Sequence, residues 1–206
     1  MKAIWLYRHK RELADQPSEF QQNIFNQGKE VGELATKLFP KGVLISADHT
    51  QGDLAIQQTL AAMGENAEAI FEAGFQFQNV LVRVDILKNN FDGTWDLIEV
   101  KSTNSVEPKA HYDDVAIQKW VLTNSGVKLR SSGLMHLNRE YQRNGELELS
   151  KLFIIEPLDD LITENFSEID SHLPSIQTIL NQTSSPIEEI GAKCNNPYQC
   201  EFTTPN

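Results

Sequence analysis

Residues 80–101 read VLVRVDILKNNFDGTWDLIEVK and decide the fold of this chain. The flanks of this stretch, 80–87 and 94–101, are dominated by residues that favour strands. The segment NNFDG at 89–93 has the composition of a turn. The sequence therefore predicts two paired strands here. A third strand is predicted at 69–77, just before them, so that the three form a meander.

Helices and further strands are predicted on both sides of the meander. Apolar residues recur at helical spacing in several segments, and Pro40 with Gly42 ends the first of them. The predicted helices cover 18–39, 53–63, 111–123 and 158–180, the last with a possible break near Pro174. Strands are predicted at 43–46 and around 133–137, and 149–155 is predicted to be strand or extended. The order of helix, three strands, helix and strand predicts an α/β fold, with a central mixed β-sheet flanked by helices.

The composition fits an ordinary folded domain. The chain has 206 residues, of which 40% are hydrophobic and 23% charged, which supports a normal core. The sequence contains no run of about 18 apolar residues, so no membrane-spanning helix is predicted. The first residues, MKAIWLYRHKREL, contain no long apolar stretch, so no signal peptide is predicted. A cytoplasmic location is therefore expected.

The net charge of −11 argues against non-specific binding to nucleic acid. The acidic residues are concentrated in two segments of the chain. Residues 46–100 hold 2 basic and 9 acidic residues, and residues 152–206 hold 1 basic and 9 acidic residues. A bound metal ion would neutralise part of the first block. The second block is typical of a solvated face or a partner surface.

Alternation along the second predicted strand separates its side chains into two sets. Residues two apart on a strand share a face. Glu99 and Lys101 therefore point the same way as Leu97, whereas Ile98 and Val100 point into the core. One carboxylate and one ammonium group are expected to stand together on one face of the sheet.

The hairpin brings a second carboxylate to the same face. If the chain folds about Phe91, Asp85 lies opposite Leu97, and Glu99 is its diagonal neighbour. Diagonal neighbours lie roughly 7–8 Å apart, which is within reach of a shared ion. Two carboxylates and the Lys101 ammonium group are thus predicted to converge.

This trio is suited to metal-dependent hydrolysis. Two carboxylates form a hard oxygen site for Mg²⁺ or Mn²⁺, and the carbonyl of Val100 is a candidate third ligand. Such an ion lowers the pKa of a bound water and stabilises charge on a phosphate. Lys101 would orient or deprotonate the water, or bind the phosphate. The alternative is an exposed ion pair worth about 0–1 kcal/mol, although the apolar neighbours of Asp85 make an unused charge there costly.

At these residues the sequence resembles the PD-(D/E)xK nuclease superfamily. Asp85 matches the motif aspartate, and Glu99-Val100-Lys101 matches the (D/E)-x-K element. Gln118, in AIQKWVL, matches a glutamine of the RecB- and Cas4-like branch. Further similarity is to the uncharacterised bacterial DUF2779 family, over the segments IWLYRHK (4–10), QGKEVGELA (27–35), HLNREY (136–141) and CNNPYQCEF (194–202).

The resemblance implies a fold, an activity and a site. It implies a restriction-endonuclease-like domain over 1–185, followed by an irregular cysteine-containing tail over 186–206. It implies metal-dependent hydrolysis of phosphodiester bonds in DNA, in repair or in defence. The implied catalytic residues are Asp85, Glu99, Lys101 and Gln118. The implied metal ligands are Asp85, Glu99 and Val100.

The sequence departs from the family pattern at the first helix. Related nucleases carry a metal-binding histidine there, and alignment places Gly32 at that position. Glu30 and Glu33 are candidate replacements, and Glu33 is preferred as the fourth metal ligand because it adjoins Gly32. A solvated acid on the helix surface is the alternative. Glu72, on the first strand of the meander, is expected to be a surface residue, and the alternative is an acid that lies near the metal without binding it.

The cysteines are the second departure. Related nucleases often hold an iron–sulfur cluster with one early and three late cysteines, whereas this chain has only Cys194 and Cys200. These two are possible cluster or zinc ligands, and a cluster is expected only if further cysteines lie outside this chain. They are otherwise free thiols.

Three hypotheses about function remain open. The first is an active nuclease that binds and cuts DNA. The second is a catalytically degenerate module that binds nucleic acid or a partner protein. The third is a nuclease domain that is competent only with further domains of a longer polypeptide. A modest set of basic residues is available to contact a phosphate backbone: Lys119, Lys128, Arg130, Arg139 and Arg143.

Overall fold

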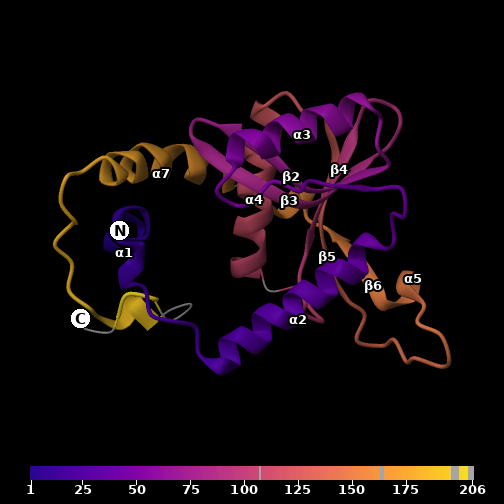
Figure 1. Cartoon of the computed structure of the whole chain (residues 1–206), viewed down its shortest axis with the longest axis horizontal. Helices are drawn as coiled ribbons and strands as arrows, with labels where there is room; N and C mark the ends of the chain where they lie inside the picture. The colour runs from indigo at the N-terminus through magenta and orange to yellow at the C-terminus, as the bar shows by residue number, and fades with distance from the viewer. Residues whose placement is uncertain (107, 163–164, 196–199, 204–206) are drawn as a thin grey trace. The chain divides into compact units, whose positions relative to one another are not determined.

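The computed structural model describes every residue except 107, 163–164, 196–199 and 204–206 (Figure 1). The chain forms two compact units. One unit consists of Phe25–Phe166, and the other consists of Met1–Ile24 together with Ser167–Asn206. The predicted boundary between residues 185 and 186 lies inside the second of these units.

The first unit is built on a six-stranded mixed sheet with the strand order β1-β2-β3-β4-β5-β6. Two neighbouring pairs, β1 with β2 and β4 with β5, are parallel, and the other pairs are antiparallel. The predicted α/β class, with a central mixed sheet flanked by helices, is confirmed. The strands are β1 (Val43–Leu44), β2 (Ala69–Phe77), β3 (Val80–Asn89), β4 (Trp95–Val100), β5 (Leu129–Leu137) and β6 (Phe153–Pro157).

The predicted helices on both sides of the meander are also present. They are α2 (Glu19–Thr36), α3 (Gly52–Gly64) and α4 (Pro108–Asn124). Two short helices, α5 (Leu149–Leu152) and α6 (Asp159–Ile162), flank β6. The expectation of strand or extended chain over 149–155 is therefore wrong at its start, where one helical turn precedes the edge strand.

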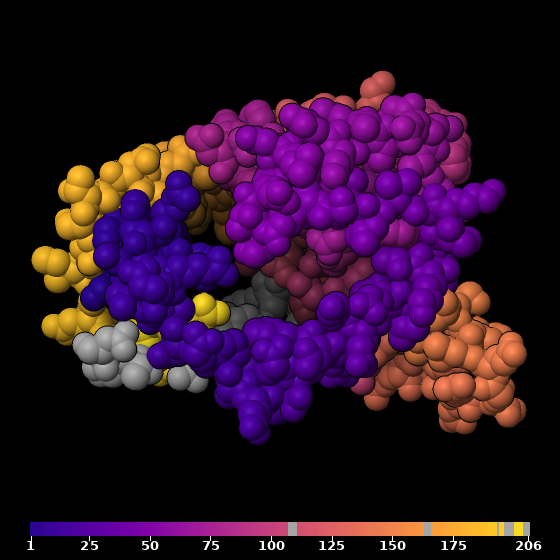
Figure 2. All heavy atoms as spheres, in the orientation of Figure 1, coloured from indigo at the N-terminus to yellow at the C-terminus, as the bar shows by residue number. Residues whose placement is uncertain are grey.

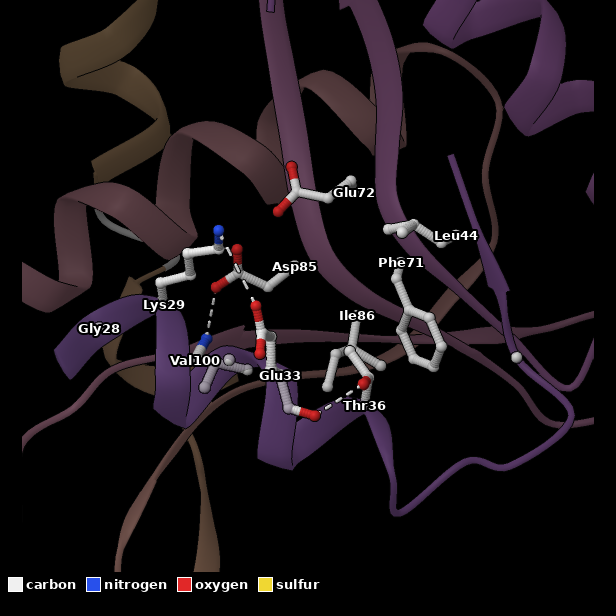
Figure 3. Close-up of a pocket in the computed structure, with 12 residues that line it drawn as sticks. Gly28, Lys29, Glu33, Thr36, Leu44, Phe71, Glu72, Asp85, Ile86 and Val100 are labelled. Atoms are coloured by element: carbon white, nitrogen blue, oxygen red, sulfur yellow. Dashed lines mark hydrogen bonds and ion pairs between the residues drawn. The ribbon is translucent and has the colours of Figure 1, made fainter. Parts of the chain in front are cut away.

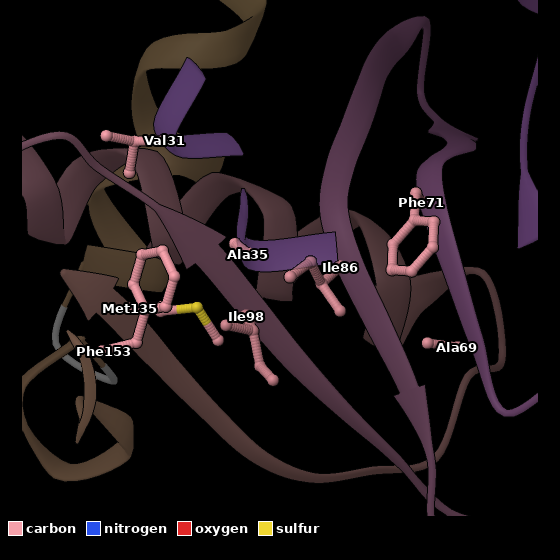
Figure 4. Close-up of a cluster of buried hydrophobic side chains, with 8 residues drawn as sticks. All are labelled: Val31, Ala35, Ala69, Phe71, Ile86, Ile98, Met135 and Phe153. Atoms are coloured by element: carbon pink, nitrogen blue, oxygen red, sulfur yellow. The ribbon is translucent and has the colours of Figure 1, made fainter. Parts of the chain in front are cut away.

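Helix α2 covers one face of the sheet (Figures 1 and 4). Val31 and Ala35, one turn apart, are buried and belong to a cluster that takes side chains from five strands. Burying this apolar surface is the main source of stability for the sheet. The strand members of the cluster are Ala69, Phe71, Ile86, Ile98, Met135 and Phe153.

Helix α4 covers the opposite face. Ile98 belongs to the α2 cluster, whereas the adjacent Glu99 is bonded to Gln118 of α4, and successive strand residues point to opposite faces. Trp120 of α4 is buried, and its ring packs edge-on against Phe77 at a centroid distance of 5.1 Å. Trp120 therefore belongs to the core.

The meander has a different register from the predicted one. Leu97 pairs with Leu87, not with Asp85, and the last pair before the turn is Asn89 with Trp95. The turn over 90–94 contains two left-handed residues, Phe91 (φ 60°) and Gly93 (φ 86°). The hairpin is therefore centred one residue later than predicted. Because the resulting shift is two residues, every side chain keeps its predicted face.

The predicted helix over 158–180 is present as two helices, α6 and α7 (Asn165–Leu180). Pro174 lies inside α7, so the break predicted there is wrong. A proline removes one helical hydrogen bond but does not always end the helix. No helix among the described residues combines the length and apolarity needed to cross a membrane.

The second unit joins the N-terminal helix α1 (Lys2–His9) to the C-terminal part of the chain. The indole Nε1 of Trp5 donates a hydrogen bond to the carbonyl of Gln182 at 2.9 Å. The backbone N–H of Lys2 donates to a carboxylate oxygen of Glu188 at 3.0 Å. These bonds explain why the two ends of the chain form one unit. Neither α1 nor the short helices η1 (Arg11–Leu13) and η2 (Ala192–Asn195) were predicted from the pattern.

A buried charge network stabilises the turn end of the meander. The side chain of Asp96 is only 9% exposed. It accepts hydrogen bonds from Lys88 Nζ at 2.9 Å, from Asn90 Nδ2 at 2.8 Å and from Arg130 Nη2 at 2.8 Å. Burial acts to raise the pKa of Asp96, but the hydrogen bonds from Asn90, Lys88 and Arg130 outweigh it and lower the pKa to about 2.

Asp96→Asn is expected to destabilise the protein by about 2–4 kcal/mol at pH 7, because Lys88 and Arg130 lose their buried anion. The pKa of Asp96 is lower in the folded protein than in the unfolded chain, where it is about 3.9. The charged carboxylate therefore stabilises the fold above about pH 3.9, and this contribution is lost as the pH falls towards 2. Urea unfolding at pH 7 and pH 3 measures both effects. The exposed Glu146→Gln is the control, and equal stability of both variants would contradict the prediction.

Candidate active site

Asp85 lies where strands β3 and β4 separate. Their pairing ends at Ile86 with Ile98. Asp85 is the residue next to Ile86, and its Oδ2 accepts a 2.7 Å hydrogen bond from the backbone N–H of Val100, two residues beyond Ile98. The carboxylate thus replaces a strand carbonyl as the acceptor, which fixes it at the point of separation. Continuing the same register places Asp85 opposite Glu99, closer than the predicted diagonal.

Glu99 is held from two sides. Its carboxylate is buried, with Oε1 2.9 Å from Lys101 Nζ. Its other oxygen, Oε2, accepts a 2.6 Å hydrogen bond from Gln118 Nε2 of α4. The structure therefore brings together the predicted residues Asp85, Glu99, Lys101 and Gln118.

The environment of Asp85 disfavours its charged form. Burial raises the pKa of Asp85 most, and the negative charges of Glu99 and Glu72 raise it further. The Val100 N–H and the Lys101 ammonium act in the opposite direction, and the resulting pKa is about 8. An ion that binds this carboxylate would therefore relieve an unfavourable charge.

Lys101 is held as an ammonium ion. Burial acts to lower its pKa, but the carboxylates of Glu99 and Asp114 outweigh burial and hold the pKa above its usual value. Asp114 Oδ2 lies 2.6 Å from Lys101 Nζ. In this arrangement Lys101 provides a positive charge rather than a base at neutral pH.

Asp114 also contacts this group of residues but was not predicted as part of the site. It lies one helical turn before Gln118 on α4, and residues four apart share a helix face. This spacing could have identified Asp114 once Gln118 was assigned.

A cavity of about 520 Å³ opens beside Asp85 (Figure 3). Glu33 and Lys29 of α2 reach it, and Glu33 Oε1 lies 4.0 Å from Lys29 Nζ. The Glu33 side chain is 66% exposed, so it is free to turn. The predicted fourth ligand therefore lines the same cavity as Asp85 and Val100.

Glu72 is exposed, as expected, with its side chain 49% accessible, and it also lines this cavity. It has a left-handed backbone (φ 57°), which is uncommon for a non-glycine residue in a strand. Arg83 Nε donates a 2.7 Å hydrogen bond to the carbonyl of Glu72. The sequence pattern carries no signal for this backbone conformation, so side-chain alternation alone could not place Glu72.

The fit of the site to a divalent cation rests on a small donor set. Within the described part of the chain, no three His, Cys, Asp or Glu side chains gather closely enough to hold a metal ion. The available donors are therefore the Asp85 and Glu99 carboxylates and the Val100 carbonyl, with water completing the set. Such oxygen-rich, partly hydrated sites suit Mg²⁺ and Mn²⁺.

Gln118 adds an observation that favours this fit. Its Oε1 atom is buried and has no hydrogen-bond partner among the described residues. A buried polar atom without a partner is costly and requires an explanation, such as a water or ion. The side chain lies against Glu99, so a hydrated cation nearby would supply that partner.

The basic residues do not form one surface for a phosphate backbone. Lys119 Nζ is 2.6 Å from Asp159 Oδ1, and Arg130 is bonded to Asp96. Arg139 and Arg143 lie on the exposed connection between β5 and β6, which projects from the sheet unit (Figure 2). Two of the residues predicted to contact a phosphate backbone, Lys119 and Arg130, are thus engaged in ion pairs with acidic side chains of the same unit.

Comparisons with known proteins do not identify a family. The sequence matches no known family model and no curated protein sequence. A solved structure described as "Crystal structure of SSO0001" is 17% identical, over 89% of this chain and 87% of that chain, with a TM-score of 0.25. A likeness at this level supports no conclusion about fold or function.

The cysteines lie in the second unit. Cys194 and Cys200 are free and partly buried, and the Cys200 N–H donates a 2.7 Å hydrogen bond to the Cys194 carbonyl. Both line a cavity of about 240 Å³ that Met1 and Leu6 also line. Their predicted role as cluster ligands stays a prediction.

Proposed function

We propose that this protein is a metal-dependent nuclease that hydrolyses phosphodiester bonds of DNA in the cytoplasm. The observation that carries the proposal is the Asp85 carboxylate, held between separating strands beside Glu99 with its pKa raised to about 8. Perturbed carboxylates beside a cavity are typical of functional sites. The order α2, β2–β4, α4, β5 also fits the fold that the family resemblance implies.

Each residue of the site has a separate role in the proposed reaction. Asp85, Glu99 and the Val100 carbonyl would hold Mg²⁺ or Mn²⁺, with Glu33 within reach from α2. Such an ion, when bound, would supply a nucleophilic water near neutral pH and would stabilise charge on the phosphate. Gln118 orients Glu99 through its 2.6 Å hydrogen bond.

Lys101 is the candidate for stabilising the transition state. Its ammonium group lies beside Glu99, and a fixed positive charge stabilises the negative charge that develops on a phosphate under attack. To contact the phosphate, Lys101 must exchange Asp114, which is 2.6 Å away, for the substrate. Asp114 thus orients Lys101 before the substrate binds.

A catalytically degenerate binding module is the second candidate. Gly32 stands where related nucleases have a metal-binding histidine, and the net charge is −11. This candidate predicts that the protein cleaves no DNA with any metal, and that DNA binding is unchanged by Asp85→Asn.

Cleavage of labelled single- and double-stranded DNA distinguishes the two candidates. The purified protein is incubated with Mg²⁺, with Mn²⁺ or with EDTA. We expect cleavage with either metal and none with EDTA. A folded protein that cuts neither substrate with either metal would contradict the nuclease proposal.

A further inference from the structure

Cys194 and Cys200 lie close together in the second unit, although five residues separate them in the sequence. The backbone N–H of Cys200 donates a 2.7 Å hydrogen bond to the carbonyl oxygen of Cys194. Both thiols are free and partly buried, and both residues line the same cavity of about 240 Å³. The two side chains therefore border one common space.

The hydrogen bond limits the distance between the two Cα atoms. A Cα atom lies about 2.4 Å from the carbonyl oxygen of its own residue and about 1.5 Å from its own nitrogen. Together with the 2.7 Å hydrogen bond, these lengths allow the Cα atoms of Cys194 and Cys200 to be at most about 6.6 Å apart. Cysteines that are joined by a disulfide have Cα atoms about 4.4–6.8 Å apart. The backbone therefore already holds the two residues close enough for a bond between their sulfur atoms.

The residues that follow Cys200 contact the N-terminal part of the same unit. The carbonyl of Glu201 accepts a 2.7 Å hydrogen bond from the backbone N–H of Asp15. The ring of Phe202 packs edge-on against the ring of Tyr7 in α1, at a centroid distance of 6.4 Å. A covalent bond between the two cysteines would therefore restrict the segment that makes both contacts.

We propose that Cys194 and Cys200 form a reversible disulfide, with a small disulfide such as oxidised glutathione as the oxidant. One cysteine thiolate attacks a sulfur atom of the small disulfide, whose S–S bond breaks and releases one small thiol. The second cysteine thiolate attacks the resulting mixed disulfide, which forms the bond between the two cysteines and releases the second small thiol. Two electrons pass from the protein to the oxidant, and the protons lost by the two cysteines protonate the released thiolates.

The partial exposure of the pair indicates a regulatory bond rather than a permanent one. Accessible disulfides are more easily reduced than buried ones, and disulfides in cytosolic proteins are usually transient. Oxidation would stabilise the contacts that Glu201 and Phe202 make with the N-terminal part of the chain, and reduction would remove this constraint. The inference concerns the second unit alone and is independent of the proposed nuclease function.

Equilibration of the full chain with reduced and oxidised glutathione tests the inference. The wild type is incubated with EDTA at a series of glutathione ratios, once folded and once unfolded in concentrated urea. Alkylation of the remaining thiols and mass spectrometry then measure the fraction that holds the internal disulfide. A disulfide that fits the fold stabilises the folded chain relative to the unfolded chain, so by linkage it forms more readily in the folded chain. Closing the seven-residue loop 194–200 predicts equilibrium constants that differ by about 50-fold.

The variants Cys194→Ser and Cys200→Ser are the matched controls. Each keeps a side chain of similar size but can form only a mixed disulfide with glutathione. The amide hydrogen of Asp15 should exchange with solvent more slowly in the oxidised wild type than in the reduced protein, and this difference should be absent in both variants. The inference would be overturned by an equal equilibrium constant in the folded and unfolded chains, or by mixed disulfides at both cysteines of the folded wild type. Equal exchange at Asp15 in the oxidised and reduced wild type would overturn it as well.

Discussion

Replacing Lys101 by methionine is expected to slow metal-dependent DNA cleavage by about 10³-fold, the scale seen when one charge-stabilising group is removed from an active site. Methionine keeps an unbranched stem of similar length but removes the ammonium group. The Lys101 side chain is 29% exposed, so the variant is expected to fold like the wild type. The effect should therefore appear in the chemical step.

Single-turnover kinetics at saturating DNA and Mn²⁺ measure this step. Mn²⁺ affinity should be unchanged or tighter in Lys101→Met, because a positive charge beside Glu99 has been removed. Lys37→Met, at an exposed position of the same unit, is the matched control. Cleavage by Lys101→Met within a few-fold of the wild-type rate would exclude a catalytic role for Lys101.

Asp85→Asn is expected to abolish cleavage and, in EDTA, to stabilise the protein by about 1–3 kcal/mol at pH 9. The pKa of the Asp85 carboxyl is about 8, because it is buried near Glu99 and Glu72. Asparagine removes the charge and can still accept the Val100 hydrogen bond. The same substitution thus improves the metal-free fold while it destroys the site.

The pH dependence follows from the raised pKa of Asp85. Between about pH 4 and pH 8 the folded protein binds more protons at this carboxyl than the unfolded chain. The wild type should therefore lose stability relative to Asp85→Asn as the pH rises through this range. Above about pH 8 the difference should stay constant.

Urea unfolding in EDTA at pH 5, 7 and 9 measures this difference, with Asp53→Asn on the surface as control. Adding Mn²⁺ should stabilise the wild type but not Asp85→Asn, because binding to the folded state adds to its stability. If the difference in unfolding free energy between the wild type and Asp85→Asn did not change with pH, the assigned environment of Asp85 would be wrong.

The grouping of Asp85, Glu99 and Lys101 on the hairpin could be predicted because it depends on local sequence patterns. Alternation placed Glu99 and Lys101 on one face, and a two-residue error in register kept Asp85 on that face. The register itself depends on left-handed backbone at Phe91 and Gly93. Phe91 gives no sign of that conformation in the sequence, so the turn was centred one residue too early.

The parts of the site that were missed depend on contacts between distant elements. Asp114 reaches Lys101 only because α4 packs across β4. Glu72 lines the cavity through a left-handed conformation. Neither fact follows from the spacing of apolar residues. Similarly, α1 forms hydrogen bonds with residues about 180 positions later, such as that of Lys2 with Glu188, and no local pattern reports them.

Anomalous diffraction from crystals soaked in Mn²⁺ tests the proposed metal site most directly. The wild type should show a peak between the carboxylates of Asp85 and Glu99 and near the Val100 carbonyl. The peak should be absent in Asp85→Asn. Crystals with Mn²⁺ bound elsewhere and no peak beside Asp85 would contradict a divalent-cation site at these residues, and with it the nuclease mechanism.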